Sequence, residues 1–134
     1  MSGIWIRWVK FNAVGAIGIV VQLVCLAILT SLGANYLCAT ALAVETAVIH
    51  NFFWHGRFTW ADRSRLSVCD TALRFAKFNV TTGVLSIVGN LAFMRLFAGV
   101  LHLPYLIANV LSIATCSIAN FVLSETVVFR PAAN

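Results

Sequence analysis

The segment "FNAVGAIGIVVQLVCLAILTSL", residues 11–32, contains no charged side chain. It exceeds the roughly 20 apolar residues that a helix needs to cross the hydrocarbon core of a bilayer. Three further stretches have the same length and character. They are 34–55, whose only charged residue is Glu45, then 78–98, whose only charged residue is Arg95, and finally 104–124, which has no charged residue. We therefore predict an all-α membrane protein with four transmembrane helices.

The composition indicates the same class of protein. The chain of 134 residues is 61% hydrophobic and 10% charged, with a mean hydropathy of +0.95, whereas soluble domains average about 25% charged residues. The first apolar run is too long for a signal peptide and shows no small-residue cleavage site, so we expect a retained anchor. The four cysteines form no CxxC pair, and nothing resembles a phosphate-binding glycine loop. We expect no enzyme activity, no metal site and no cofactor.

The basic residues predict the orientation in the membrane. Eight of the nine lysines and arginines precede the first apolar stretch, lie between the second and third, or follow the fourth. By the positive-inside rule, we expect a multi-pass protein of the bacterial cytoplasmic membrane with both termini and the central loop in the cytoplasm. The net charge of +5 then indicates anionic lipids as partners and no nucleic acid.

Two motifs occur twice along the chain. A basic-aromatic motif reads "RWVKFN" at 7–12 and returns 67 positions later as "RFAKFN" at 74–79. An exit motif that begins with Asn-Phe reads "NFFWHGRFTW" at 51–60 and returns 69 positions later as "NFVLSETVVF" at 120–129. The two offsets indicate a duplicated helix hairpin whose second copy contains a two-residue insertion, most simply near its outer turn.

The duplication predicts how the chain is organised. One copy spans residues 7–60 and the other 74–129, joined by a cytoplasmic linker, 61–73, within a single membrane domain, 1–134. Because each copy contains two helices, both copies start from the cytoplasmic side, and a pseudo-twofold axis along the membrane normal relates them. Small and polar residues recur at helical spacing within the spans. Such stripes pack helices together or line a substrate path, and packing is the commoner role.

On these motifs, in this order, the chain resembles the GtrA-like family of small four-span bacterial membrane proteins associated with cell-surface polysaccharide synthesis. The resemblance implies movement of a polyprenyl-phosphate-linked sugar across the membrane, or assistance to the glycosyltransferase that makes it. The family's exit motif often contains Asn-Arg-Arg, of which this chain keeps Arg57, while Ser124 and Glu125 stand at two of these positions in the second copy. If the arginines hold a phosphate, the second copy does not do so in the same way.

Glu45 is the most informative single residue. It lies about eleven residues beyond the outer turn, near the middle of the membrane, where an unpaired carboxylate is costly. Ala114 stands at its position in the second copy, so the duplication does not require a carboxylate. We expect Glu45 to contact substrate or to couple transport to protons, and the alternative is a structural hydrogen bond.

A group of polar and basic residues is expected where the helices meet the inner headgroups. Arginine binds phosphate with a planar fork and lysine binds it as a point charge, so these residues form a candidate ring around a lipid phosphate. For the basic residues the alternative is topology signalling alone, and for the amides and imidazoles it is helix packing. Together with Glu45, the predicted substrate-binding residues are Arg7, Lys10, His50, Asn51, His55, Arg57, Arg74, Lys77 and Asn120.

Two functions from different classes follow. The first is a flippase for polyprenyl-phosphate-linked sugars that works as a homo-oligomer, since four helices can hardly enclose a glycolipid headgroup alone. The second is a non-transporting scaffold that recruits or stabilises a membrane glycosyltransferase. A small multidrug exporter also has four spans and a membrane glutamate, but the strong charge bias and the place of Glu45 in the second span argue against it.

Overall fold

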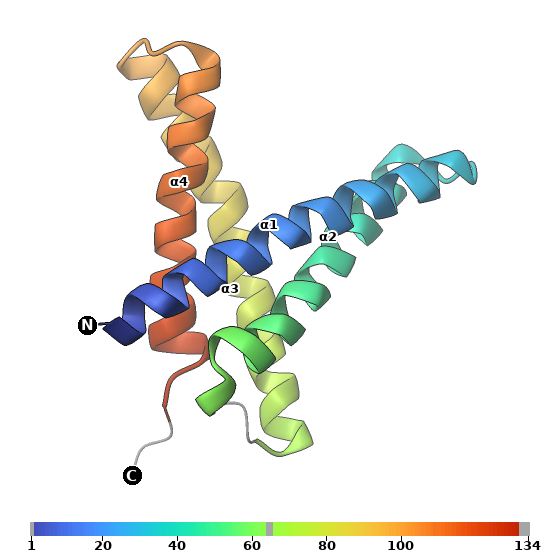
Figure 1. Ribbon diagram of the computed structural model, residues 1–134. Coiled ribbons are helices and arrows are strands. Elements are labelled where there is room, and N and C mark those ends of the chain that lie inside the picture. The colour runs from blue at the N-terminus through green and yellow to red at the C-terminus, as the bar shows by residue number, and fades with distance from the viewer. Residues whose placement is uncertain (1, 64–65, 132–134) are drawn as a thin grey trace. The chain divides into compact units, whose positions relative to one another are not determined.

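The computed structural model describes residues 2–63 and 66–131, which contain four long helices and no strand. The prediction of an all-α protein is confirmed. The helices are α1, Ser2–Ser31, α2, Tyr36–Trp54, α3, Val68–Met94, and α4, Tyr105–Leu123 (Figure 1). Short segments follow three of them: the π-helices η1, His55–Thr59, η3, Arg95–Val100, and η4, Ser124–Val128, and the 3₁₀-helix η2, Ala61–Arg63.

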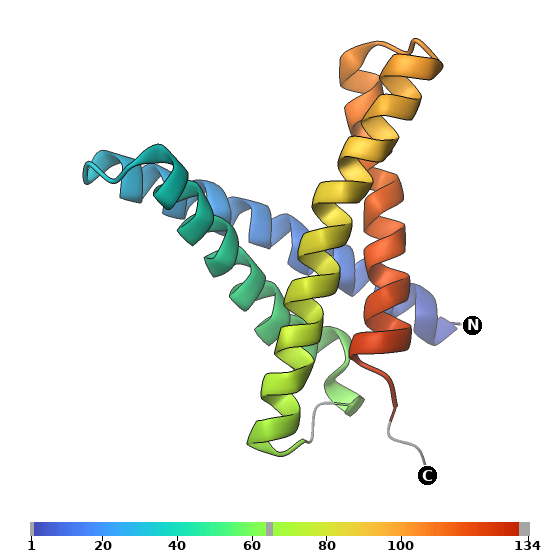
Figure 2. The ribbon, with the colours of Figure 1, turned by 180° about the vertical axis from the view of Figure 1, so that it is seen from behind.

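The chain divides into two compact units, Met1–Ser64 and Arg65–Asn134. Each unit is an antiparallel pair of helices, α1 with α2 and α3 with α4, which we call hairpin one and hairpin two (Figures 1 and 2). The boundary between the units falls within the predicted linker. Each hairpin is described by itself below, and the predicted pseudo-twofold relation between them stays a prediction.

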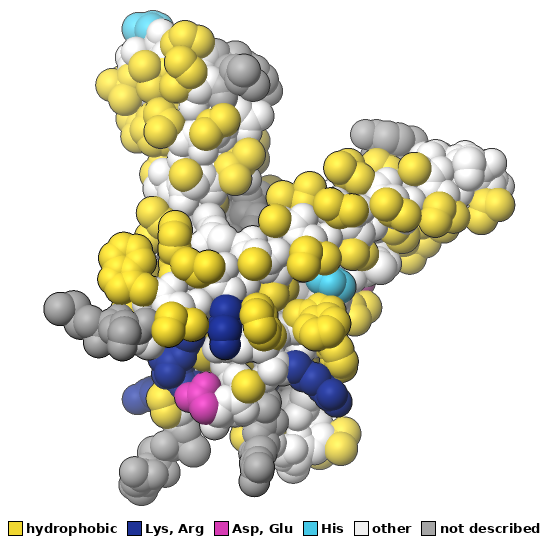
Figure 3. Space-filling view, in the orientation of Figure 1, with side chains coloured by type: hydrophobic (Ala, Val, Ile, Leu, Met, Phe, Trp, Pro, Cys, Tyr) yellow, Lys and Arg dark blue, Asp and Glu magenta, His cyan; other side chains and the backbone are white. Residues whose placement is uncertain are grey.

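Three helical stretches among the described residues are long and apolar enough to cross a membrane: Gly3–Ser31, Val68–Val100 and Ile107–Val128. Large apolar side chains such as Leu23 and Leu91 lie exposed along them, as a lipid-facing surface requires. Figure 3 shows hydrophobic side chains along the visible surface of each hairpin. The nineteen residues of α2 are about 28 Å long, close to the roughly 30 Å hydrocarbon core. A complete crossing by α2 stays a prediction.

Two of the helices, α1 and α3, begin well before the predicted apolar stretches. The first starts at Ser2 and the third at Val68, so both basic-aromatic motifs lie inside helices. At the start of α3, the Ser67 hydroxyl accepts a hydrogen bond from the Asp70 backbone N–H over 3.2 Å and donates one to the Asp70 carboxylate over 2.7 Å. Such a cap satisfies a backbone donor of the first turn. The hydropathy of the sequence marks only the part of a helix that can lie within the membrane. The helix itself can extend beyond that part, as far as its capping residue.

The turns that join the two helices of each hairpin, which we call the outer turns after their predicted place, each contain a residue in the left-handed backbone region. Gly33 has a φ of 86° and His102 a φ of 53°, and the two are 69 positions apart. At the end of α1, the N–H of Ala34 donates to the carbonyl of Leu29 over 3.0 Å and that of Gly33 to Thr30 over 3.1 Å, the bonds of a Schellman motif. Because the basic-aromatic motifs are 67 positions apart, the two extra residues of the second copy lie before its outer turn, in α3 and η3.

Small residues form the seam of each hairpin. Three alanines on one face of α2 are buried, and three small residues 69 positions later on α4 are buried as well: Ala39, Ala43, Ala47, Ala108, Ser112 and Cys116. Small side chains allow helix backbones to approach closely in a membrane, where packing rather than the hydrophobic effect holds helices together. The packing interpretation of the small-residue stripe therefore holds for Ser112 and Cys116.

Gly18 marks a close approach of α1 and α2. The glycine is buried, and a Cβ atom placed on it would overlap the side-chain amide of Asn51. In hairpin two, a Cβ on Gly89 would lie 2.9 Å from the sulfur of Cys116, below any ordinary contact distance. At both places the two helices can approach this closely only because one of them carries no side chain.

Candidate functional site

The end of hairpin one that is predicted to face the cytoplasm, which we call its inner end, is built around a buried aromatic cluster of Phe11, His55 and Trp60. The ring of Phe11 stacks on the imidazole of His55 with centroids 4.7 Å apart and 10° between the planes, and the Trp60 ring meets the imidazole edge-on at 5.4 Å. The Nδ1 atom of His55 is 3.1 Å from the Thr59 hydroxyl. His55, predicted as a substrate residue, is 2% exposed. It is therefore part of the packed interior in this structure.

A π-helical turn forms this cluster. In η1 the backbone N–H of Trp60 donates to the carbonyl of His55, five residues earlier, over 2.8 Å. The same bond joins Phe129 to Ser124 in η4, also over 2.8 Å. The wider turn brings the exit aromatic back against the first helix, as Trp60 against Phe11 at 6.0 Å and as Phe129 against Phe78 at 6.3 Å. Such turns are frequent at functional sites.

Lysine and arginine side chains at this end lie over aromatic rings. The ammonium nitrogen of Lys10 is 4.7 Å from the centroid of the Phe58 ring and donates a hydrogen bond to the Phe58 carbonyl over 3.4 Å. The guanidinium carbon of Arg57, an exposed side chain, is 5.0 Å from the centroid of the Phe53 ring. Cation–π contacts of this kind hold a charge at the edge of an apolar surface. An anionic headgroup at that edge would meet both cations.

Arg7 lies at the same end and takes part in an ion pair that the sequence did not predict. Its Nη2 atom is 3.5 Å from the Asp62 carboxylate, which Arg63 also approaches to 3.7 Å. Asp62 is 60% exposed, so the pair is screened by water and contributes little stability. A carboxylate beside Arg7 competes with any phosphate for the same guanidinium.

An apolar pocket of about 310 Å³ opens between α1 and α2 beside Lys10. We call it the inner pocket. Its lining residues follow one face of each helix, three or four residues apart: Ala13, Val14, Ile17, His50, Trp54 and Phe58. His50 thus reaches this pocket as a predicted site residue, and its Nδ1 atom is 3.2 Å from the Asn51 side-chain oxygen. Trp54 and Phe58 were missed as site residues, although their four-residue spacing from His50 was a visible signal.

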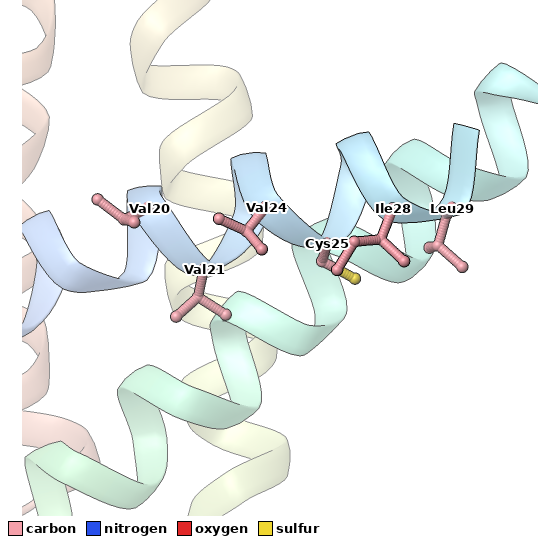
Figure 4. Close-up of a pocket in the computed structure, with 6 residues that line it drawn as sticks. All are labelled: Val20, Val21, Val24, Cys25, Ile28 and Leu29. Carbon is pink, nitrogen blue, oxygen red and sulfur yellow. The ribbon is translucent and has the colours of Figure 1, made fainter. Parts of the chain in front are cut away.

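A second apolar hollow, of about 380 Å³, lies along the outer half of α1 (Figure 4). Its lining contains no charged residue: Val20, Val21, Val24, Cys25, Ile28 and Leu29. The thiol of Cys25 is 3.8 Å from the Thr46 hydroxyl of α2. With no polar side chain to orient a ligand, this surface suits lipid tails or a neighbouring helix and has no visible chemistry.

Glu45 is half-buried near the middle of α2. At 100° per residue it lies on the opposite side of the helix from Ala43 and Ala47, which face α1. The hairpin seam therefore does not enclose the carboxylate. Its predicted role stays a prediction.

In hairpin two the predicted site residues have different surroundings. The Arg74 guanidinium carbon lies 5.2 Å from the Phe129 ring centroid, and Lys77 is exposed. Asn120 donates from its side-chain amide to the Ser86 hydroxyl over 3.2 Å, and its buried side-chain oxygen has no hydrogen-bond partner among the described residues. A phosphate-binding ring that joins Arg74 and Lys77 to Arg7, Lys10 and Arg57 stays a prediction.

The chain was compared with known proteins. Residues 10–129 match the family model described as "GtrA/DPMS, transmembrane domain". A similar curated protein is "Dolichol-phosphate mannosyltransferase" from Pyrococcus furiosus, which is 31% identical over 121 residues. The alignment covers 90% of this chain and 33% of that enzyme, so the chain spans about a third of the relative's length.

Proposed function

Because the chain belongs to the GtrA/DPMS transmembrane-domain family, we propose that it moves polyprenyl-phosphate-linked sugars across the bacterial cytoplasmic membrane for cell-surface polysaccharide synthesis or modification. The observation that carries the proposal is the placement of Lys10 and Arg57 over aromatic rings at the inner end of hairpin one. A lipid whose only charged group is a terminal phosphate or diphosphate matches cations at the border of an apolar surface.

Reconstitution tests this function directly. The purified protein is placed in liposomes that contain a fluorescent polyprenyl-phosphate sugar, and the fraction accessible to a membrane-impermeant quencher is followed over time. We expect the protein to accelerate exchange between the leaflets relative to empty liposomes. Equal rates with and without protein, for a range of sugars, would contradict the flippase proposal.

The named relative favours a second candidate function. That relative is a mannosyltransferase about three times as long as the matched segment, so a membrane module of this family occurs within a glycosyltransferase chain. This chain would then anchor or position a separate glycosyltransferase without moving lipid. Glycosyltransferase activity that rises when this protein is added, with no leaflet exchange by the protein alone, would favour the scaffold.

The proposed orientation places both termini and residues 61–73 in the cytoplasm. Cys69 is exposed at the start of α3, and Asn35 lies in the outer turn of hairpin one. In variants with a single cysteine in intact cells, we expect an impermeant maleimide to label Asn35→Cys and to label Cys69 only after the membrane is opened. Labelling of Cys69 from outside would reverse the orientation.

Arg7 and Arg74 are proposed to bind the lipid phosphate. A basic residue near an anionic lipid surface contributes about 1 kcal/mol, so Arg7→Gln with Arg74→Gln is expected to weaken glycolipid binding by roughly fivefold per arginine. Equilibrium binding in detergent micelles measures the change. Lys10, Arg57 and Lys77 remain, so insertion in the membrane is expected to be normal.

Asp62→Asn provides the matched control, because it removes the carboxylate that lies 3.5 Å from Arg7. If Arg7 binds phosphate, losing this competitor is expected to strengthen binding. If Arg7 serves only to hold Asp62, the Asp62 and Arg7 variants will behave alike.

A further inference from the structure

We propose that the inner pocket of hairpin one binds the phosphate-proximal isoprenyl units of one polyprenyl phosphate, with the Lys10 ammonium as the partner of its phosphate. The inference rests on the proposed function and adds the place where the lipid is held. It would also serve the scaffold function, because a protein that presents lipid to an enzyme must hold that lipid.

The size and opening of the pocket select a single chain. Its volume of about 310 Å³ lies at the lower end of the range for ligand pockets, roughly 300–1,000 Å³. Ile17, Trp54 and Phe58 line it while remaining 55%, 46% and 45% exposed, so the pocket opens sideways to the lipid around the hairpin. One narrow, branched prenyl chain can enter from that side, whereas a phospholipid would have to place two acyl chains.

The charges lie at one end of the pocket. Lys10 precedes Ala13 and Val14 by one helical turn, and its ammonium lies over Phe58, so a cation stands directly beside the inner rim. Arg57, adjacent to Phe58 in sequence, is a second cation at the same end of the hairpin, where it lies over the Phe53 ring. The lining residues themselves carry no lysine, arginine or acid. An apolar chain that ends in one phosphate fits this order of apolar wall and cationic rim.

Hairpin two lacks the aromatic wall. At the positions of His50, Trp54 and Phe58, 69 residues later, it carries Ala119, Leu123 and Val127. Its Lys77 has no aromatic ring at the position of Phe58 to rest on and is exposed. We therefore expect the prenyl chain to be bound at hairpin one and not at hairpin two. Leu123 and Val127 also indicate that leucine at position 54 and valine at position 58 are compatible with a helix of this kind.

Photolabelling of the full-length protein tests the inference. The probe is a short polyprenyl phosphate with a diazirine on its first isoprenyl unit, and mass spectrometry locates the adducts. We expect adducts on residues of the inner pocket that unlabelled polyprenyl phosphate prevents and phosphatidylglycerol does not. Combining Trp54→Leu with Phe58→Val is expected to reduce affinity at least about tenfold, because it removes two aromatic side chains that a bound prenyl chain would cover.

Trp5→Leu is the control, since Trp5 is a tryptophan of α1 that is 65% exposed and lies outside the pocket. This variant is expected to bind polyprenyl phosphate like the parent. Binding is compared only among variants whose thermal unfolding midpoints in detergent equal that of the parent. Adducts elsewhere, unchanged labelling of the pocket variant, or equal competition by phosphatidylglycerol would overturn the inference.

The flipping assay on the same preparations separates this inference from the proposed function. Leaflet exchange with adducts only outside the pocket refutes the site and leaves the flippase proposal standing. Specific labelling of the pocket without leaflet exchange keeps the site and refutes the flippase in favour of the scaffold.

Discussion

Replacing Glu45 with glutamine is expected to abolish most of the transport activity while the protein still inserts and assembles. Glu45 lies about 14 Å from either end of α2, on the side away from α1. An ionised acidic side chain at the middle of a membrane helix costs about 2.5–3.5 kcal/mol, and a protein keeps such a group when its chemistry is used. Glutamine preserves the shape and most of the hydrogen bonding but cannot carry charge or a transferable proton.

The measurement is leaflet exchange in liposomes, together with restoration of surface-polysaccharide modification in cells. Glu125→Gln makes the same chemical change in η4, near the inner end of hairpin two, and is expected to keep the parent activity. Full activity of the Glu45 variant would reduce this residue to a packing role and shift the weight to the scaffold function.

Gly18→Ala is expected to destabilise hairpin one, whereas Gly15→Ala is expected to stabilise it. A Cβ at Gly18 would overlap the Asn51 amide, so this side chain must turn away from its contact with His50. Overpacking of this kind costs about 1–3 kcal/mol. A Cβ at Gly15 meets nothing within 4 Å, and alanine is favoured over glycine in a helix by about 0.8–1.0 kcal/mol.

Thermal unfolding midpoints in detergent are expected to shift in opposite directions for the two variants. Adding Asn51→Ala to Gly18→Ala is expected to recover part of the loss, because the overlapping amide is then gone. A Gly18 variant as stable as the Gly15 variant would show that α1 and α2 separate at no cost at this point.

Much of the secondary structure was predictable because its signals are local. Apolar runs with at most one charged residue predicted the helices, and the break between the first two runs, at residue 33, predicted the outer turn of hairpin one. The repeated motifs also indicated equivalent positions, since Phe11 and Phe78 are both buried at the inner end of their hairpins. These features depend on composition and on spacing along the chain, which a sequence displays directly.

The site was predicted less completely, because its contacts join residues that are distant in sequence. The pairing of Arg7 with Asp62 spans more than fifty positions, and no pattern marks it. His55 is predicted to meet a ligand, and its packing against Phe11 and Trp60 in the structure is a contact that the sequence did not indicate. Its role there follows from a π-helical turn, and a helical pattern of period 3.6 gives no warning of such a turn.

The two exit turns have a consequence for the phase of the helices. An α-helix advances 100° per residue, so a regular continuation of α2 would carry Trp60 well around the axis from His55. The π-turns at η1 and η4 each accommodate an additional residue and thereby reset this phase by about one position. Faces assigned from α2 or α4 therefore shift by about one position within residues 55–60 and 124–129, although Phe58 still lines the same pocket as His50 and Trp54. Deleting one residue from either turn would let a regular α-turn replace the π-turn and leave the exit aromatic on nearly the same side of the axis, because four steps of about 100° exceed a full turn by only about 40°.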